Sequence, residues 1–385
     1  MVLAANFIAI AARMSLVTFL GIWFVREARI DLATVGVAFL VEHVLRGAAS
    51  PMFGALSDRI GRRSLLIGAA LASAVVLPCF LLVSGPATLM IWSVAMGLCG
   101  AINMPVGTAL LLDLAPADRR QSTLALNYTV MSVAYTLGVS PAGYVAEQGY
   151  GLLALTASLG YLTVAGLYLM VLRGPLPLDR GEQKHLLVQT ASVFRDRIFL
   201  AFAALAFVFP LSMGLVVSAS PLFAADAGLG EGFIGLVLGL NSIIVAIFAL
   251  PVASRIEASG PFRPLGAAAL LVAACFACYA FVPQPAAALV AGTVVFSFGE
   301  LVFSSAVPAA VARLAPAGRR GLYQGGWALV GSFSMGSALF VSGLLRDAVG
   351  WEGVWKVSAL LAGMLAIILW LCRQRFLEAS ERVSH

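Results

Sequence analysis

The chain has 385 residues, of which 61% are hydrophobic and only 11% charged, with a formal net charge of +6 at pH 7. A soluble protein has about a quarter of its residues charged, because polar side chains must cover its apolar core. The composition therefore excludes an ordinary soluble protein and predicts an all-α integral membrane protein, since open sheet edges are forbidden in lipid.

Runs without charge mark the membrane spans. Residues 64–112 contain no Asp, Glu, Lys, Arg or His, which is enough for two spans joined at 84–86. The first span has no basic n-region or small-residue cleavage site, so we interpret it as a retained helix. This reading predicts twelve transmembrane helices, at about 3–25, 32–56, 64–84, 86–113, 122–146, 150–173, 197–224, 231–253, 263–282, 285–312, 321–346 and 351–372.

The distribution of Lys and Arg indicates the orientation, because positive charge in short loops stays in the cytoplasm. With both termini cytoplasmic, most of the 24 Lys and Arg residues lie on that side. Those outside are Arg26, Arg29, Arg346 and Lys356. We therefore expect a multi-pass protein of the bacterial inner membrane, whose basic charge meets anionic membrane lipids and not nucleic acid.

A repeat divides the chain. The sequence LAPADRR at Leu114–Arg120 returns as LAPAGRR at Leu314–Arg320, after the fourth helix of each half. This predicts two parallel six-helix halves, 1–173 and 197–385, joined by a cytoplasmic linker at 174–196. Such repeats bind their substrate between the halves and expose it to alternate sides, and one chain encloses the pathway, so we expect a monomeric transporter.

The segment between the second and third predicted helices reads GALSDRIGRR, at 54–63. It resembles the signature of the major facilitator superfamily: glycine, any residue, Leu, a small residue, Asp, Arg, any residue, Gly, Arg, Arg. The resemblance implies the fold of that superfamily, alternating access, and transport of a small molecule driven by a proton gradient without a cofactor. The gating residues that it implies are Gly54, Asp58, Arg59, Gly61, Arg62, Arg63 and Asp113.

Two expectations concern this gate. Asp58 lies close enough to the third helix to cap its start. The resemblance further implies that Asp58 meets the start of the eleventh helix near Gly321, and that Arg62 pairs with Asp113, so that the cytoplasmic side closes.

The sequence departs from the proton-coupled drug antiporters of the superfamily at two places. Ser93 stands where they carry an arginine in the fourth helix, and residues 138–143 retain only part of their Gly-Pro motif in the fifth.

Ionisable residues within the spans are the candidate functional groups, because each costs at least about 2.5–3.5 kcal/mol to insert. They are Arg13, Glu42, His43, Arg46 and Glu300. Glu42 and Arg46 share a helical face, with His43 beside them as a relay or a packing residue. The resemblance implies that Arg13 and Glu300 face each other across a central cavity.

Two interpretations of these charges stay open. In the first, Glu42 or Glu300 carries the coupling proton, and Arg13 and Arg46 stabilise the acids or hold an anionic part of the substrate. Glu300 is the better proton site, because no cation lies near it in sequence. In the second, Arg13, Glu42 and Arg46 form a fixed ion network that holds the first two helices together.

Further polar and aromatic side chains are candidates for lining the cavity, although packing between helices is the alternative for each. They are Asn103, Asn127, Tyr128, Tyr135, Asn241, Gln324 and Trp327. The seventh helix, around 202–217, is almost wholly apolar, which favours an amphiphilic substrate over a sugar.

The leading hypothesis is a proton-coupled exporter of a small amphiphilic or drug-like solute. The alternatives are a transporter of a lipid, lysolipid or lipid-linked headgroup, and proton-coupled uptake of an organic anion. An enzyme is not expected, because HExxH and GxSxG motifs are absent. No metal site is expected either, since Cys275 and Cys278 lie within an apolar helix and are interpreted as packing residues.

Overall fold

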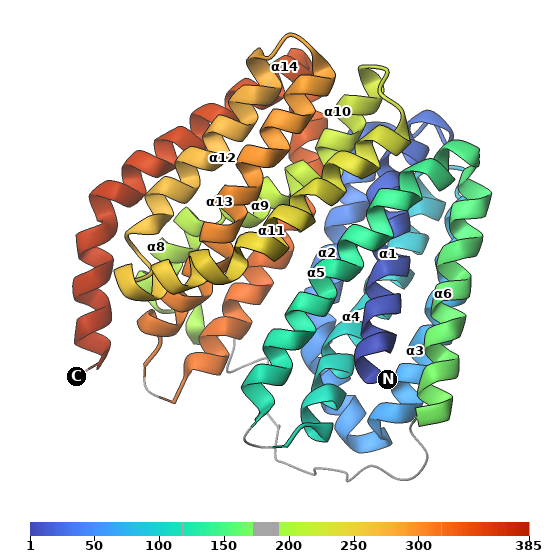
Figure 1. Cartoon of the computed structure of the whole chain (residues 1–385), viewed down its shortest axis with the longest axis horizontal. Coiled ribbons are helices and arrows are strands. Elements are labelled where there is room, and N and C mark those ends of the chain that lie inside the picture. The colour runs from blue at the N-terminus through green and yellow to red at the C-terminus, as the bar shows by residue number, and fades with distance from the viewer. Residues whose placement is uncertain (117–118, 172–191, 317, 385) are drawn as a thin grey trace.

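The computed structural model describes residues 1–116, 119–171, 192–316 and 318–384, and within these residues the chain forms helices and no strands (Figure 1). One bundle holds the N-terminal helices. They are α1 (Val2–Arg26), α2 (Leu32–Ile60), α3 (Arg62–Val76) with the 3-10 turn η1 (Pro78–Leu82), α4 (Pro86–Leu114), α5 (Arg120–Gln148) and α6 (Tyr150–Val171).

The second bundle begins with an interrupted helix, in which the π-helical turn η3 separates two α-helical parts. The elements are α8 (Arg197–Ala206), α9 (Val208–Gly214), η3 (Leu215–Ala219), α10 (Ser220–Asp226), α11 (Glu231–Ser259), α12 (Pro264–Phe281), α13 (Pro285–Leu314) and α14 (Arg320–Ser384). Helix α14 turns at Gly350, whose φ of 70° is left-handed, so it comprises the two last predicted spans.

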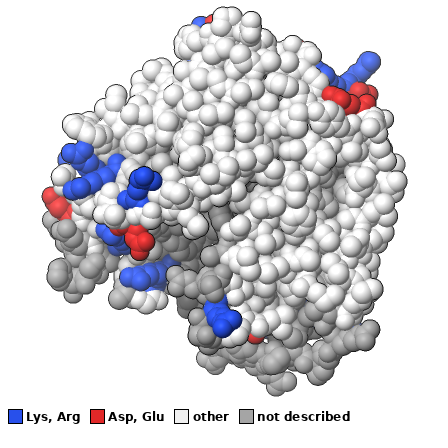
Figure 2. Space-filling view, viewed as in Figure 1, with Lys and Arg blue, Asp and Glu red and all other residues white. Residues whose placement is uncertain are grey.

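Ten helices within the described residues are long and apolar enough to cross a membrane. Helix α5, with 29 residues, is not among these ten, and α14 counts as one of them. The chain is therefore a multi-pass membrane protein of two helical bundles, as predicted, while the number of twelve spans stays a prediction. Figure 2 agrees with this, because the charged side chains visible in it gather near the helix ends and leave an uncharged belt between.

The predicted linker 174–196 lies outside the described residues except for its last five, so the division into halves at 173 and 197 stays a prediction. In the described part, Asp196 caps α8: its Oδ1 accepts hydrogen bonds from the backbone N–H groups of Ile198 and Phe199 at 2.8 and 3.2 Å.

The signature segment is mostly helical, which corrects a prediction. Helix α2 continues past the expected end at residue 56 to Ile60, because Gly61, with a φ of 91°, is the first residue that breaks the helix. Asp58 therefore lies within α2, and the N-cap of α3 is Gly61. Asp58 is therefore not the N-cap residue of the third helix, and its side chain, which the capping prediction concerns, lies outside the described part of the chain.

Both chain termini lie at the same end of the molecule, which we name the terminal face, and the opposite end is the distal face (Figure 1). The bundles pack closely toward the distal face. Gly36 of α2 lies against the backbone of Phe340 in α14, and Gly143 of α5 lies against the carbonyl of Glu231 in α11. From there α5 and α11 diverge toward the terminal face (Figure 1). The structure is thus closed at the distal face.

We expect Gly36→Ala to lower the thermal unfolding midpoint of the purified protein, because the added methyl group would overlap the backbone of Phe340. Overpacking of this kind costs about 1–3 kcal/mol. Tryptophan fluorescence during a temperature ramp measures the midpoint. The control is Gly68→Ala in α3, where a methyl group meets nothing within 4 Å. Equal midpoints for both variants would contradict the close packing of α2 on α14.

Candidate functional site

A cavity of about 290 Å³ lies between the two bundles, and helices of both contribute to its wall. Its polar residues are Asn6, Arg13, Arg46, Asn103, Thr108, Ser132, Tyr135, Tyr161, Asn241, Ser242 and Glu300. Its apolar side chains include Ile10, Met14, Met131, Met213 and Val245.

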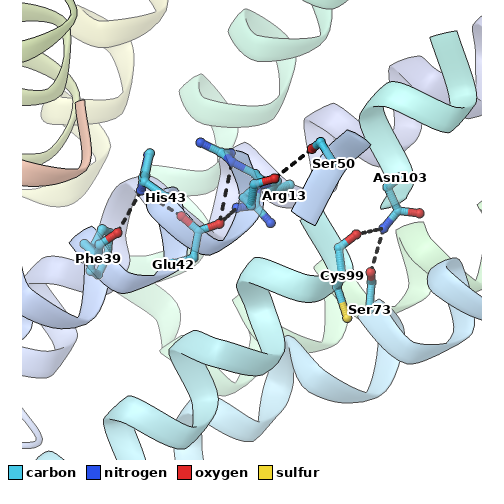
Figure 3. Close-up of polar contacts among 9 residues, drawn as sticks. Arg13, Phe39, Glu42, His43, Ser50, Ser73, Cys99 and Asn103 are labelled. Carbon is cyan, nitrogen blue, oxygen red and sulfur yellow. Dashed lines mark hydrogen bonds and ion pairs between the residues drawn. The ribbon is translucent and has the colours of Figure 1, made fainter. Parts of the chain in front are cut away.

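A cluster of four ionisable side chains, Arg13, Glu42, His43 and Arg46, joins α1 to α2 (Figure 3). One oxygen of Glu42 accepts a hydrogen bond from Nη2 of Arg13 at 2.5 Å and lies 3.9 Å from Nε of Arg46. The other oxygen lies 2.7 Å from Nδ1 of His43, which also donates to the carbonyl of Phe39 at 2.9 Å. Since Glu42 and His43 are 6% and 7% exposed, the carboxylate is held away from water by its partners.

This geometry favours the fixed-network interpretation for Glu42, because two guanidinium groups and an imidazole surround it. Arg46 is the most loosely held member: its side chain is 23% exposed and lines the cavity. His43 also packs against Gly336 of α14, so the cluster lies where α2 meets the other bundle.

Glu300 lies on the opposite wall, in α13. Its Oε2 accepts a hydrogen bond from Nδ2 of Asn241 at 2.9 Å, and the same amide donates to Oγ of Ser297 at 3.0 Å. Ser297 in turn donates to the carbonyl of Thr293 at 2.8 Å. Among the described residues no Lys, Arg or His pairs with Glu300. The structure therefore brings Arg13, Arg46 and Glu300 to one cavity, whereas the resemblance implied this only for Arg13 and Glu300; their functional role stays a prediction.

Of the seven predicted lining residues, three line the cavity, three do not, and the side chain of one is not described. Asn103, Tyr135 and Asn241 line the cavity. Asn103 also donates to Oγ of Ser73 at 2.8 Å and to the carbonyl of Cys99 at 3.2 Å (Figure 3). The side chain of Tyr128 lies outside the part of the chain that the structure describes.

Three predicted lining residues do not line this cavity. Asn127 is buried and accepts a hydrogen bond from Asn6 at 3.0 Å. Gln324 donates to the carbonyl of Pro308 at 2.7 Å, and Trp327 packs against the apolar core. Each of these side chains is thus used in packing between helices, which was the alternative interpretation.

Sequence reasoning missed Asn6 and Tyr161, which line the cavity. Asn6 could have been found, because it is seven residues before Arg13 and therefore lies on the same helical face. Nothing in the sequence distinguishes Tyr161 from the other aromatic residues of α6.

The expected ion pair is present, since Nη1 of Arg62 lies 2.6 Å from Oδ2 of Asp113. Both residues belong to the first bundle, so this pair alone does not close the terminal face. Among the described atoms, nothing lies within 4 Å of a Cβ placed at Gly54 or Gly321, so neither of these two glycines packs against another helix. The gating role of Arg59, Arg63 and the other signature residues stays a prediction.

At the distal face one described ion pair, between Arg26 and Asp226, crosses between the bundles, and further contacts hold Asp226 within the second bundle. Asp226, at the end of α10, lies 2.9 Å from Nη2 of Arg346 and accepts a hydrogen bond from Nε1 of Trp351 at 2.8 Å. It also lies 3.9 Å from Arg26 of α1, which donates to the carbonyl of Ala225. We name Asp226 and the three side chains around it, Arg26, Arg346 and Trp351, the Asp226 clasp.

We expect Asp226→Asn to loosen the distal face, because the variant loses the charge that holds Arg26 and Arg346 together. Hydrogen–deuterium exchange measured by mass spectrometry should then be several-fold faster at the distal ends of α5 and α11, residues 139–148 and 231–239. The control is Asp347→Asn, an exposed acid near the same face. Unchanged exchange in Asp226→Asn would show that the clasp does not hold the face shut.

The seventh predicted span breaks near its middle. Pro210 has no N–H to donate, and Oγ of Ser334 in α14 donates to the carbonyl of Phe207 at 2.5 Å. The π-helical turn η3 follows directly, and such turns are frequent at functional sites. Met213, between the break and the turn, contributes to the cavity.

The fold and the site define a multi-pass membrane protein whose two helical bundles enclose a charged cavity. The chain belongs to the Major Facilitator Superfamily, whose family model matches residues 2–233 and 202–383.

Curated relatives match parts of the chain. A Na(+), Li(+), K(+)/H(+) antiporter of Planococcus maritimus is 29% identical over 126 residues, which are 31% of this chain and 29% of the relative. The multidrug resistance protein MdtG of Salmonella paratyphi A is 24% identical over 228 residues, which are 58% of this chain and 56% of the relative. The matches thus span about a third and about half of the lengths of these relatives.

Solved structures share the fold over nearly the whole chain. The nucleoside transporter NupG superposes with a TM-score of 0.82 at 14% identity, covering 96% of this chain and 97% of that one. A POT family transporter in complex with 5-aminolevulinic acid superposes with a TM-score of 0.79 at 13% identity, covering 97% and 96%.

Proposed function

We propose that the protein is a secondary transporter that exports a small amphiphilic solute across the bacterial inner membrane in exchange for protons. The observation that carries the proposal is Glu300, an acid in the wall of a cavity between two bundles without a described cationic partner. A charge at this depth needs neutralisation when the cavity closes around it, and a proton or a cationic group can supply it.

Glu300 suits the role of proton carrier better than Glu42. The carboxylate of Glu42 is already neutralised by Arg13 at 2.5 Å and approached by His43 and Arg46. A proton on Glu42 would leave two guanidinium groups without an acid between them, which is unfavourable. Protonation of Glu300 removes one unpaired charge and leaves its hydrogen bond to Asn241 available.

The distribution of positive charge supports an orientation with both termini in the cytoplasm. In that orientation the open terminal face is cytoplasmic, and the Asp226 clasp closes the outer side. The conformation would be the inward-facing one, in which an exporter loads its substrate. The names of the relatives, a Na(+), Li(+), K(+)/H(+) antiporter and a multidrug resistance protein, are consistent with export in exchange for protons.

The cavity volume disfavours a lipid with two chains, while a lysolipid or a lipid-linked headgroup stays an alternative. About 290 Å³ is near the lower end of pockets that hold drug-sized ligands, and a two-chain lipid needs more room. Uptake of an organic anion stays an alternative, because Arg46 faces the cavity.

The test is transport by purified protein in liposomes with an imposed pH gradient. A series of amphiphilic cations, anions and zwitterions is added, and an enclosed pH dye records proton movement while the solute is measured by mass spectrometry. We expect at least one solute to move against its gradient, with protons moving the opposite way. Solute and proton moving in the same direction would support uptake instead. Solute movement that does not depend on the pH gradient would overturn the proposal of proton coupling.

A further inference from the structure

The two walls of the cavity carry opposite charge. The wall of the first bundle holds the guanidinium groups of Arg13 and Arg46 with the single carboxylate of Glu42 between them, which leaves one positive charge over. A proton on His43 would only add to that excess. The facing wall holds Glu300, with no described cation beside it. A ligand between the walls therefore meets a positive and a negative side.

Arg46 has hydrogen-bonding capacity left for a ligand. The only described polar contact of its side chain is the 3.9 Å approach of Nε to Glu42, which is longer than a hydrogen bond. An arginine carries five N–H donors in a planar fork that fits a carboxylate or phosphate. Arg13 is different, because Nη2 of Arg13 already donates to Glu42 at 2.5 Å. Arg46 is thus the primary anion-binding group, and Arg13 adds charge behind it.

Glu300 offers a matching acceptor. Of its two oxygens, Oε2 accepts from Asn241, and Oε1 has no donor among the described residues. Between the charged walls the lining is apolar and flexible, with Met14, Met131 and Met213 among its side chains. Methionine adapts to ligands of different shape, so this part of the cavity suits an apolar body of variable form.

We propose that the cavity selects amphiphilic zwitterions, with the anionic group at Arg46, the cationic group at Glu300 and the apolar part against the methionines. A ligand with a single charge satisfies one wall and leaves the charge of the other wall desolvated without a partner, which is a penalty against it. Movement of the ligand across the membrane rests on the proposed function. The selectivity of binding does not depend on it. The proposal also explains why ligand and protons would move in opposite directions, because a proton and the cationic group of the ligand compete for Glu300.

Binding to the purified protein in detergent tests the charge selectivity. Three zwitterions of increasing charge separation serve as probes: phenylalanine, leucyl-phenylalanine and 8-aminooctanoate. Each is compared with its N-acetyl derivative, which is anionic, and its carboxamide, which is cationic. Isothermal titration calorimetry measures the affinities for wild type, Arg46→Gln and Glu300→Gln. Arg375→Gln and Glu378→Gln, exposed residues near the end of α14, are the matched controls.

We expect at least one zwitterion to bind about tenfold or more tightly than both of its single-charge derivatives. Arg46→Gln should remove the preference over the cationic derivative, because the carboxylate no longer has its partner. Glu300→Gln should remove the preference over the anionic derivative. Both control variants should bind as wild type does.

The proposal is overturned if single-charge derivatives bind as tightly as the zwitterion on all three skeletons, or if the preference survives both substitutions. This result is separable from the proposed function. Charge-selective binding without proton-coupled movement in liposomes would contradict the transport proposal and leave the binding site standing. Proton-coupled transport of a solute that carries a single charge, without selective binding of zwitterions, would contradict the binding proposal and leave the transport proposal standing.

Discussion

Glu300→Gln is expected to reduce solute accumulation driven by a pH gradient to the level of liposomes without protein. The substitution keeps the size of the side chain and a hydrogen bond with Asn241, which lies 2.9 Å from Oε2, but removes the group that takes up a proton. Movement of solute down its own gradient should fall less than accumulation does, because the substitution weakens binding of a cationic group but leaves the two bundles and the Asp226 clasp unchanged. The readout is the ratio of accumulated solute with and without the pH gradient.

Two variants control this result. Glu378→Gln removes an exposed acid at the end of α14 and should accumulate solute as wild type does. Glu300→Asp retains an acid on a shorter side chain and should keep part of the coupling. Full accumulation by Glu300→Gln would show that the coupling proton binds elsewhere, and Glu42 would then be the next candidate.

Glu42→Gln is expected to have the largest effect on stability. It leaves the half-buried Arg13 and Arg46 without their shared carboxylate, which lies 2.5 Å from Arg13. Removing one partner of a buried pair typically costs about 3–5 kcal/mol, because the remaining charge is uncompensated. The thermal unfolding midpoint of the purified protein should therefore fall well below that of wild type.

A second substitution separates charge from a general loss of packing. The double variant Arg13→Gln and Glu42→Gln removes one charge of each sign, and it should recover part of the midpoint lost in Glu42→Gln. A double variant no more stable than the single one would contradict the ion network as the cause. Arg375→Gln, which removes an exposed arginine, should leave the midpoint unchanged.

The membrane helices could be predicted because lipid excludes charge over a fixed length. The run 64–112 without ionisable residues covers most of the described helices α3 and α4, and the break between them includes Gly85, as expected. The end of α2 could not be predicted from the distribution of charge, because charged residues such as Arg59 are tolerated in the part of a helix that extends beyond the lipid. There the boundary depends on Gly61 and its positive φ.

The charged part of the site could also be predicted, because an acid or base inside a span is rare and costly. Arg13, Arg46 and Glu300 meet at one cavity for this reason. Neutral residues carry no comparable signal. Asn127 and Gln324 are used in hydrogen bonds between helices, and only the rotation of each helix in the bundle decides this.

The central claim is that Glu300 binds the coupling proton, and infrared difference spectroscopy of the purified protein across a pH titration tests it most directly. A protonated carboxyl group has a C=O stretching band that disappears when the proton leaves. We predict a band of this kind in wild type that is missing in Glu300→Gln and present in Glu378→Gln. A titrating band that is unchanged in Glu300→Gln would contradict the claim.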